Sequence, residues 1–165
     1  MEKIVIVING SGGVGKDTLC EAVKEKMPVR IVSSVDPIKA LARTGGWQGE
    51  KDDKGRLLLV RLKQAFVEYN DLPCKYLLQE YEAFLKSEEK VMFAHIREPE
   101  EISKFRRAVG KNCKTLLVTR NTGISWHNES DGGVNGYDYD YRFDNDLPLP
   151  EAKEAFRALI GEIIK

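Results

Sequence analysis

Residues 10–18 read GSGGVGKDT, and they follow the apolar run KIVIVIN at residues 3–9. The run predicts a buried strand, and the stretch EAVKEKM at 21–27 predicts the body of a helix. A glycine-rich loop between a strand and a helix N-terminus turns its backbone N–H groups toward an anion, which the helix dipole also attracts. The spacing G-x4-G-K is typical of sites for nucleoside triphosphates. The sequence therefore predicts a nucleotide-binding loop.

This loop is expected to bind phosphates mainly through its backbone, because glycines reach conformations with positive φ that a Cβ penalises. A lysine at its end adds a cation for the outer phosphates. The residues predicted to contact the triphosphate are Ser11, Gly12, Gly13, Val14, Gly15, Lys16, Asp17 and Thr18. A glycine-rich turn without a ligand is the alternative, but the strand before it and the helix after it both favour a phosphate site.

Asp17 occupies the position where most such loops carry a Ser or Thr that binds magnesium, and Thr18 follows it. A carboxylate this near a triphosphate repels it unless a cation lies between them. Asp17 is therefore a candidate Mg²⁺ ligand, directly or through water, and Thr18 is a second candidate. The alternative is a helix-start residue, because an Asp suits the positive end of the helix dipole.

Length and charge restrict the classes of function. The chain has 165 residues, enough for one domain spanning 1–165, and its 26 acidic and 26 basic residues balance. We therefore expect no binding to a nucleic acid polymer, and no apolar stretch is long enough to predict a membrane span. The odd number of cysteines and their wide spacing predict free thiols in a reducing cytoplasm; they are Cys20, Cys74 and Cys113.

Predicted strands and helices alternate along the chain. The strands lie at 3–9, 29–34, 91–96, 114–120 and 137–143. Further helices lie at 35–43, 56–70, 73–87, 98–110 and from about 150 to the end, with polar loops at 44–55 and 121–136. This alternation predicts a three-layer α/β fold with a central, mostly parallel five-stranded sheet and helices on both faces. Ligands bind such sheets at the carboxyl ends of the strands.

Arg97 directly follows the strand at 91–96, so we expect its guanidinium to point into that crevice and grip phosphate. The alternative for Arg97 is an ion pair with Glu98 or Glu101. Lys63, on the helix at 56–70, is more simply interpreted as part of a solvated helix face. Arg56, at the start of the same helix, fits either phosphate binding or a solvated helix face.

Three stretches beyond the loop resemble the P-loop (Walker A) kinases, above all the deoxynucleoside monophosphate kinases of bacteriophage type, and also the animal-type phosphomevalonate kinases. They are SSVDPIKALA at 33–42, HIREPEEISKF at 95–105 and YDYRFDNDLPLPEA at 139–152. The resemblance implies the P-loop NTPase fold. It also implies transfer of a phosphoryl group from ATP, with Mg²⁺, to a small phosphorylated acceptor, most of all a (deoxy)nucleoside monophosphate. Phosphomevalonate or another metabolite phosphate is an alternative acceptor.

The resemblance also implies roles for particular residues. Arg97 would contact the acceptor phosphate, in a site lined by Asp36, Lys39 and Arg56 and built on an insertion at about 36–87. On the donor side, Arg120 would lie by the nucleotide, and Asn145 to Pro148 would edge the adenine pocket. The residues expected to act in catalysis are Lys16, Asp17, Arg97 and Arg120. The expected oligomeric state is a monomer or a homodimer.

Two departures from the family pattern bear on catalysis. His95 stands where the family has an aspartate that can hold magnesium through water, which shifts the metal role to Asp17 or Asp36. The segment 121–136, expected to be the lid, lacks Arg and Lys and carries Glu129 and Asp131. A non-catalytic nucleotide-binding regulatory protein is therefore a further alternative. The region 44–72 matches the family least well.

Overall fold

The apolar run at the start of the chain forms the central strand of a parallel sheet. All six residues of β1 (Ile4–Asn9) are buried, because the strand has neighbours on both sides and helices on both faces. The computed structural model describes residues 2–120 and 136–165. The strands run in the order β2-β3-β1-β4-β5, and every pair is parallel. The other strands are β2 (Val29–Ser33), β3 (Val91–His95), β4 (Cys113–Thr119) and β5 (Tyr141–Asp144).

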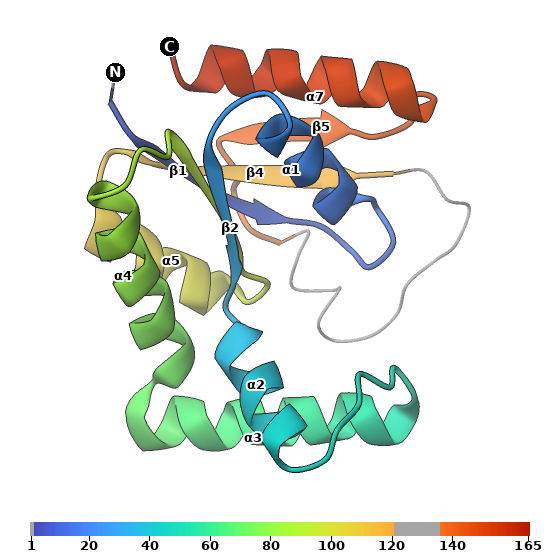
Figure 1. Ribbon diagram of the computed structural model, residues 1–165, viewed down its shortest axis with the longest axis vertical. Coiled ribbons are helices and arrows are strands. Elements are labelled where there is room, and N and C mark those ends of the chain that lie inside the picture. Colours follow the sequence, from blue (N-terminus) through green and yellow to red (C-terminus); the bar gives the residue numbers. More distant parts are fainter. Residues whose placement is uncertain (1, 121–135) are drawn as a thin grey trace.

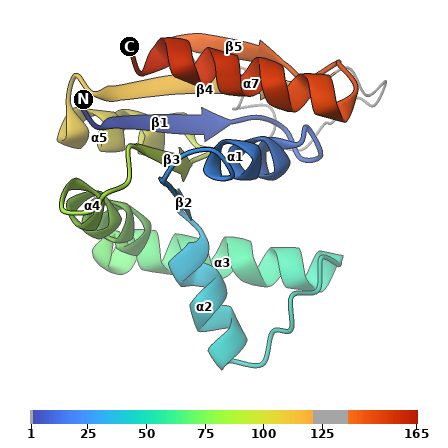
Figure 2. The same cartoon turned by 45° about the horizontal axis from the view of Figure 1, so that its top comes forward.

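Helices cover the two faces of this sheet (Figures 1 and 2). On one face, α1 (Lys16–Lys24) and α7 (Leu149–Ile163) pack against the alternate residues of β1 that include Ile6. On the other face, α4 (Leu72–Leu85) and α5 (Pro99–Val109) pack against those that include Val7. The predicted three-layer α/β fold with a five-stranded sheet is therefore confirmed. Within the described ranges, no helix has both the length and the apolarity to cross a membrane.

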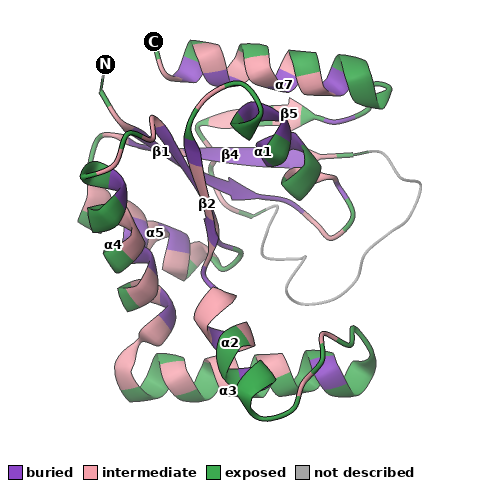
Figure 3. Cartoon of the chain, viewed as in Figure 1, coloured by how far each residue is buried: buried purple, intermediate pink, exposed green. Residues whose placement is uncertain are grey.

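Two further helices of the described residues extend away from the sheet as an arm (Figure 1). They are α2 (Asp36–Thr44) and α3 (Asp53–Asn70), which contact each other, and both contact α4. The longest helix of the described chain, α3, buries only one of its 18 residues, Gly55. Its exposed surface is visible along the bottom of Figure 3. Asp71 alone separates α3 from α4, in a left-handed conformation with φ of 55°.

The predicted start of the strand at 137–143 is wrong, because β5 begins only at Tyr141. The reason is a side-chain contact that replaces the sheet ladder. The carboxylate of Asp140 accepts hydrogen bonds from the backbone N and the hydroxyl of Thr115, at 3.0 and 3.2 Å. It also accepts two from the guanidinium of Arg106, at 2.8 and 2.9 Å. The segment before β5 is thus fixed by side chains, and Tyr139 packs against the apolar core there.

The helix predicted at 56–70 begins three residues earlier, and the predicted loop at 44–55 is correspondingly shorter. The side chain of Asp52 accepts a hydrogen bond from the backbone N of Gly55 at 2.8 Å, which caps the first turn. The prediction of free thiols is confirmed for all three cysteines, of which Cys20 and Cys113 are buried and Cys74 is half-buried.

Candidate active site

The glycine-rich loop after β1 has the shape of a cradle. Gly13 and Gly15 have φ values of 84° and 89°, which side chains with a Cβ rarely adopt. A Cβ placed on Gly12 or Gly13 would meet no atom within 4 Å, so the space above the loop is open. The loop starts close to β4, because a Cβ on Gly10 would lie 2.4 Å from the carbonyl oxygen of Val118. An open cradle of backbone at a helix N-terminus fits a phosphate chain.

Asn145, just after β5, holds this loop in place. Its side-chain Nδ2 donates to the carbonyl of Val14 at 2.7 Å, and its backbone N donates to the carbonyl of Thr119 at 2.7 Å. A Cβ on Gly15 would lie 2.7 Å from the same Nδ2. Asn145 is thus buried against the loop, and contact between this residue and an adenine ring stays a prediction.

Asn9, the last residue of β1, joins both halves of the site. Only 1% of the surface of Asn9 is exposed to solvent. Its Nδ2 donates to the carbonyl of Arg97 and to the hydroxyl of Tyr139, both at 3.0 Å, and its Oδ1 accepts from the backbone N of Gly10 at 2.9 Å. Sequence reasoning did not single out Asn9. The available signal was a polar residue at the end of an otherwise apolar buried run.

Three charged or polar side chains meet where α1 begins. The Nζ of Lys16 donates to the carbonyl of Gly10. The side chain of Asp17 is 94% exposed, and its Oδ1 lies 3.7 Å from the Nε2 of His95. Burial lowers the pKa of His95 to about 4, so its imidazole is neutral near pH 7. A neutral imidazole cannot replace the anionic carboxylate that the family pattern has at this position.

His95 marks the point where residues from two different loops converge. Besides burial, the charges of Lys16 and Asp17 at the start of α1 act on its pKa. The charges of Asp36 and Lys39 on α2 act on it as well. Asp17 lies 3.7 Å from the imidazole, and Asp36 accepts a hydrogen bond from Ser33, which pairs with His95 across β2 and β3. The structure brings the predicted triphosphate loop and part of the predicted acceptor site to one edge of the sheet, as parallel sheets favour.

Asp36, the first residue of α2, is held in a fixed orientation. Its Oδ2 accepts a hydrogen bond from the backbone N of Ser33 at 2.8 Å and another from the hydroxyl of Tyr76 at 3.2 Å. Tyr76 lies on α4, 40 residues farther along the chain. Sequence reasoning missed Tyr76, because no local pattern connects it with Asp36.

Arg97 is exposed and lies two residues beyond the end of β3, at the edge that carries the loop. Glu98 and Glu101, the ion-pair partners considered for it, both bind the ammonium of Lys63, at 2.8 and 3.1 Å. The side chain of Lys63 is only 15% exposed, so its interpretation as part of a solvated helix face is wrong.

The two other arginines predicted at the site are both exposed. Arg120 follows the end of β4, at the same edge of the sheet as the loop. Arg56 lies in the first turn of α3, and no contact among the described residues joins it to Asp36 or Lys39. The segment 121–136, predicted to be the lid, lies outside the described residues except for Gly136.

The start of α1 offers oxygen ligands of the kind that Mg²⁺ prefers. Asp17 supplies an exposed carboxylate and Thr18 a hydroxyl beside the open cradle. The described residues contain no cluster of three or more His, Cys, Asp or Glu that could hold a metal alone. Magnesium in phosphoryl-transfer sites takes one or two carboxylates, with substrate phosphates and water as its other ligands. The residues present therefore fit Mg²⁺ bound together with a nucleotide.

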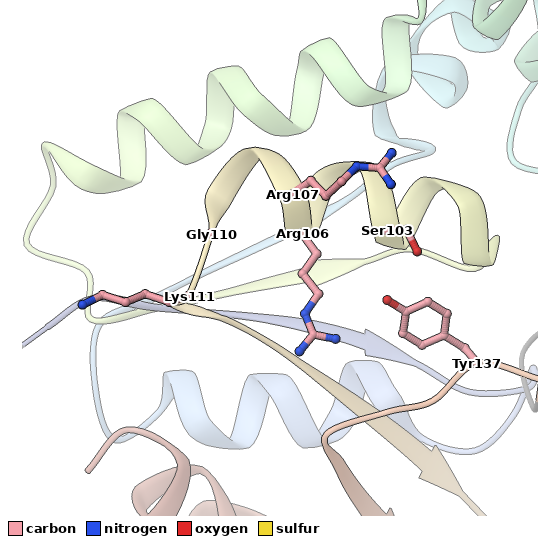
Figure 4. A pocket seen from close by; sticks show the side chains of 6 residues that line it. All are labelled: Ser103, Arg106, Arg107, Gly110, Lys111 and Tyr137. Carbon is pink, nitrogen blue, oxygen red and sulfur yellow. The ribbon is translucent and has the colours of Figure 1, made fainter.

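A separate open hollow lies beside α5. It is lined by Ser103, Arg106, Arg107, Gly110, Lys111 and Tyr137 (Figure 4). Arg107 and Lys111 point away from Tyr137, in different directions, and Arg106 already pairs with Asp140. The hollow reaches the amino end of β4, whereas the glycine-rich loop follows the carboxyl end of β1. This hollow therefore does not coincide with the glycine-rich loop.

No protein-family model and no curated protein sequence matches the chain. Solved structures nevertheless match nearly all of it. The tunicamycin resistance protein of Deinococcus radiodurans matches with a TM-score of 0.61 and 14% identity, over 97% of this chain and 96% of that chain. TT1252 from Thermus thermophilus matches with a TM-score of 0.54 and 20% identity, over 98% of each chain. The fold is that of the P-loop NTPases.

A shikimate kinase from Bacteroides thetaiotaomicron has the same fold, with a TM-score of 0.52, 16% identity and 98% of each chain covered. A protein described as a sugar kinase, from Janibacter, matches with a TM-score of 0.52 and 15% identity, over 98% of this chain and 95% of that chain. At such identities the similarity shows a common fold. What these proteins phosphorylate is a property of their own sites.

Proposed function

We propose that this protein is an ATP- and Mg²⁺-dependent kinase that phosphorylates a small phosphorylated acceptor, namely a (deoxy)nucleoside monophosphate. One observation carries the proposal. Asp17 from the predicted triphosphate loop lies 3.7 Å from the imidazole of His95, and Asp36 from the predicted acceptor site accepts a hydrogen bond from Ser33, which pairs with His95 across β2 and β3. A donor half and an acceptor half that meet at one point are what direct phosphoryl transfer requires. The kinases among the solved structures with this fold support transfer to a small molecule.

In the proposed reaction, an anionic oxygen of the acceptor phosphate attacks the γ-phosphorus of ATP. A new P–O bond forms there, the bond from the γ-phosphorus to the β–γ bridging oxygen breaks, and ADP leaves. The attacking oxygen carries no proton to remove, so no general base is required. The protein contributes position and charge: the loop backbone and Lys16 hold the donor, and Arg97 and Lys39 hold the acceptor phosphate. Arg120 offsets negative charge on the donor side.

Asp17 and Thr18 are the residues that would hold Mg²⁺ in this reaction. Held by these two residues, Mg²⁺ would neutralise part of the charge of the phosphates. His95 cannot share this task as a carboxylate would, because its imidazole is buried and neutral. The exposed carboxylate of Asp17 therefore carries more of the metal binding than it would beside a second acid.

The test is a panel of acceptors with ATP and Mg²⁺. Purified protein is incubated with the common ribo- and deoxyribonucleoside monophosphates, and with phosphomevalonate, and both ADP and the phosphorylated acceptor are measured. We expect ADP and a nucleoside diphosphate in equal amounts, and no turnover in a Lys16→Ala variant. Turnover of phosphomevalonate alone would contradict the nucleotide acceptor. Tight ATP binding without turnover of any acceptor would contradict a kinase and indicate a regulatory protein.

A further inference from the structure

In the proposed acceptor site, the carboxylate of Asp36 accepts hydrogen bonds from the described residues through only one of its two oxygens. Both hydrogen bonds to Asp36, from the backbone N of Ser33 and from the hydroxyl of Tyr76, go to Oδ2. The other oxygen, Oδ1, takes no hydrogen bond from the described residues. A carboxylate that is fixed through one oxygen presents the lone pairs of the other in a defined direction.

Tyr76 is well suited to hold this carboxylate. Its ring packs against the apolar core formed by α4, α5 and the sheet, so the position of its hydroxyl is set by packing. Burial raises the pKa of this hydroxyl, and the nearby charges of Asp36 and Glu80 raise it further. The hydroxyl therefore remains protonated, and it remains a hydrogen-bond donor throughout the physiological pH range.

A carboxylate beside a site for a phosphorylated molecule needs an explanation, because it repels phosphate. Asp36 nevertheless lies at the carboxyl edge of the sheet, because it accepts a hydrogen bond from Ser33, which pairs with His95 across β2 and β3, and Lys39 follows on α2. Its repulsion is tolerable if the acceptor turns a hydrogen-bond donor toward Asp36 and its phosphate toward Lys39 and Arg97. A carboxylate held in one orientation distinguishes these two ends of an acceptor, whereas a freely rotating carboxylate does so less well.

We propose that Tyr76 is a positioning residue of the acceptor site, whose hydroxyl fixes Asp36 so that Oδ1 accepts a hydrogen bond from a hydroxyl or amino group of the acceptor. The assignment rests on the proposed kinase function. It predicts that Tyr76 governs the affinity for the acceptor and leaves the affinity for ATP unchanged, since the triphosphate loop makes no described contact with it.

The first experiment compares Tyr76→Phe with Tyr81→Phe. Both variants keep an aromatic ring that packs against the same core, and only the first loses a hydroxyl bound to Asp36. With the monophosphate that the wild-type protein phosphorylates fastest, we expect Tyr76→Phe to raise the KM for that acceptor roughly five- to tenfold. The KM for ATP and the kcat should change less than about twofold, and Tyr81→Phe should match the wild type. Thermal unfolding of each variant checks that the fold is retained.

The second experiment asks whether Tyr76 acts through Asp36. Asp36→Ala removes the carboxylate and both of its oxygens, and Tyr76→Phe is then added in that background. If Tyr76 acts through Asp36, the second substitution changes the KM for the acceptor less than about twofold. Effects that multiply, or a Tyr76→Phe variant with wild-type kinetics, would overturn the assignment while the wild-type turnover still supports the kinase function. Absence of turnover by the wild type with every acceptor would overturn both.

Discussion

The amide of Asn145 donates a hydrogen bond of 2.7 Å to the carbonyl of Val14, and this contact joins the segment after β5 to the triphosphate loop. The two residues are 131 positions apart in the chain. Asn145 is buried, so water does not easily replace it as the partner of that carbonyl. The loop is therefore held in shape before any nucleotide binds, which lowers the cost of ordering it around phosphates.

An Asn145→Asp variant tests this role. The substitution replaces a donor with a carboxylate that faces the Val14 carbonyl, leaving the carbonyl unpaired and adding negative charge near the phosphates. We expect the free energy of unfolding to fall by about 1–3 kcal/mol and the Kd for ATP to rise at least about tenfold. Denaturant unfolding and calorimetric titration measure the two effects. Asn112→Asp, at the opposite end of β4, makes the same charge change and should leave ATP binding near wild type.

The close approach of Gly10 to β4 predicts a strong effect of an added methyl group. In Gly10→Ala the new Cβ would lie 2.4 Å from the backbone oxygen of Val118, and a strand in the middle of the sheet cannot easily move away. We expect a loss of roughly 1–3 kcal/mol in the free energy of unfolding. Gly12→Ala is the matched control, because its Cβ meets no atom within 4 Å and stability should stay within about 0.5 kcal/mol. Equal losses in the two variants would contradict the packing argument.

The two interpretations of Asp17 make different predictions. If Asp17 helps to bind Mg²⁺, Asp17→Asn should raise the magnesium concentration for half-maximal turnover roughly tenfold. If it only favours the start of α1, the same variant should lose about 0.3–1 kcal/mol of stability and keep its magnesium requirement. Magnesium titrations at saturating ATP decide between the two. Glu21→Gln, one turn farther along α1, removes an exposed carboxylate as well and serves as the control.

Glu101 gives the protein a pH-dependent stability. Burial raises its pKa to about 7, and repulsion from Glu98 adds to this, while Lys63 opposes it. In the unfolded chain the same carboxyl titrates near its usual value of 4.5. Between these two values the folded state holds more protons than the unfolded state. The contribution of Glu101 to the free energy of unfolding should therefore fall as the pH rises from about 5 to about 7.5, whereas the lowered pKa of His95 acts in the opposite direction below about 6.5.

A Glu101→Gln variant should lose this component of the pH dependence. The amide carries no charge to bury, so the variant should be more stable than the wild type at about pH 8. Its advantage in the free energy of unfolding should be smaller at about pH 5. Chemical denaturation at a series of pH values measures the slope. Glu100→Gln, the exposed neighbour on α5, should keep the wild-type slope. A Glu101→Gln variant with the same slope as the wild type would contradict the raised pKa.

The sequence predicted the fold and the donor loop because their signals are local. The apolar run of β1, the glycine spacing and the helix that follows lie within the first 24 residues, and each agrees with the next. The acceptor side depends on contacts between distant segments. Tyr76 meets Asp36 across 40 residues, and Lys63 meets Glu98 across 35. No periodicity shows which of several charged residues will meet after α3 and α4 have packed, so Tyr76 was missed and Lys63 was misinterpreted.

The exposed helix α3 has a consequence for how this protein can change over evolutionary time. Because only Gly55 of its 18 residues is buried, most positions on α3 can be substituted at little cost to folding. The residues of β1 have no such freedom, since all six are buried. Region 44–72, which resembles known kinases least, includes α3 entirely. Substitutions on this helix can therefore accumulate while the sheet and the glycine-rich loop stay unchanged.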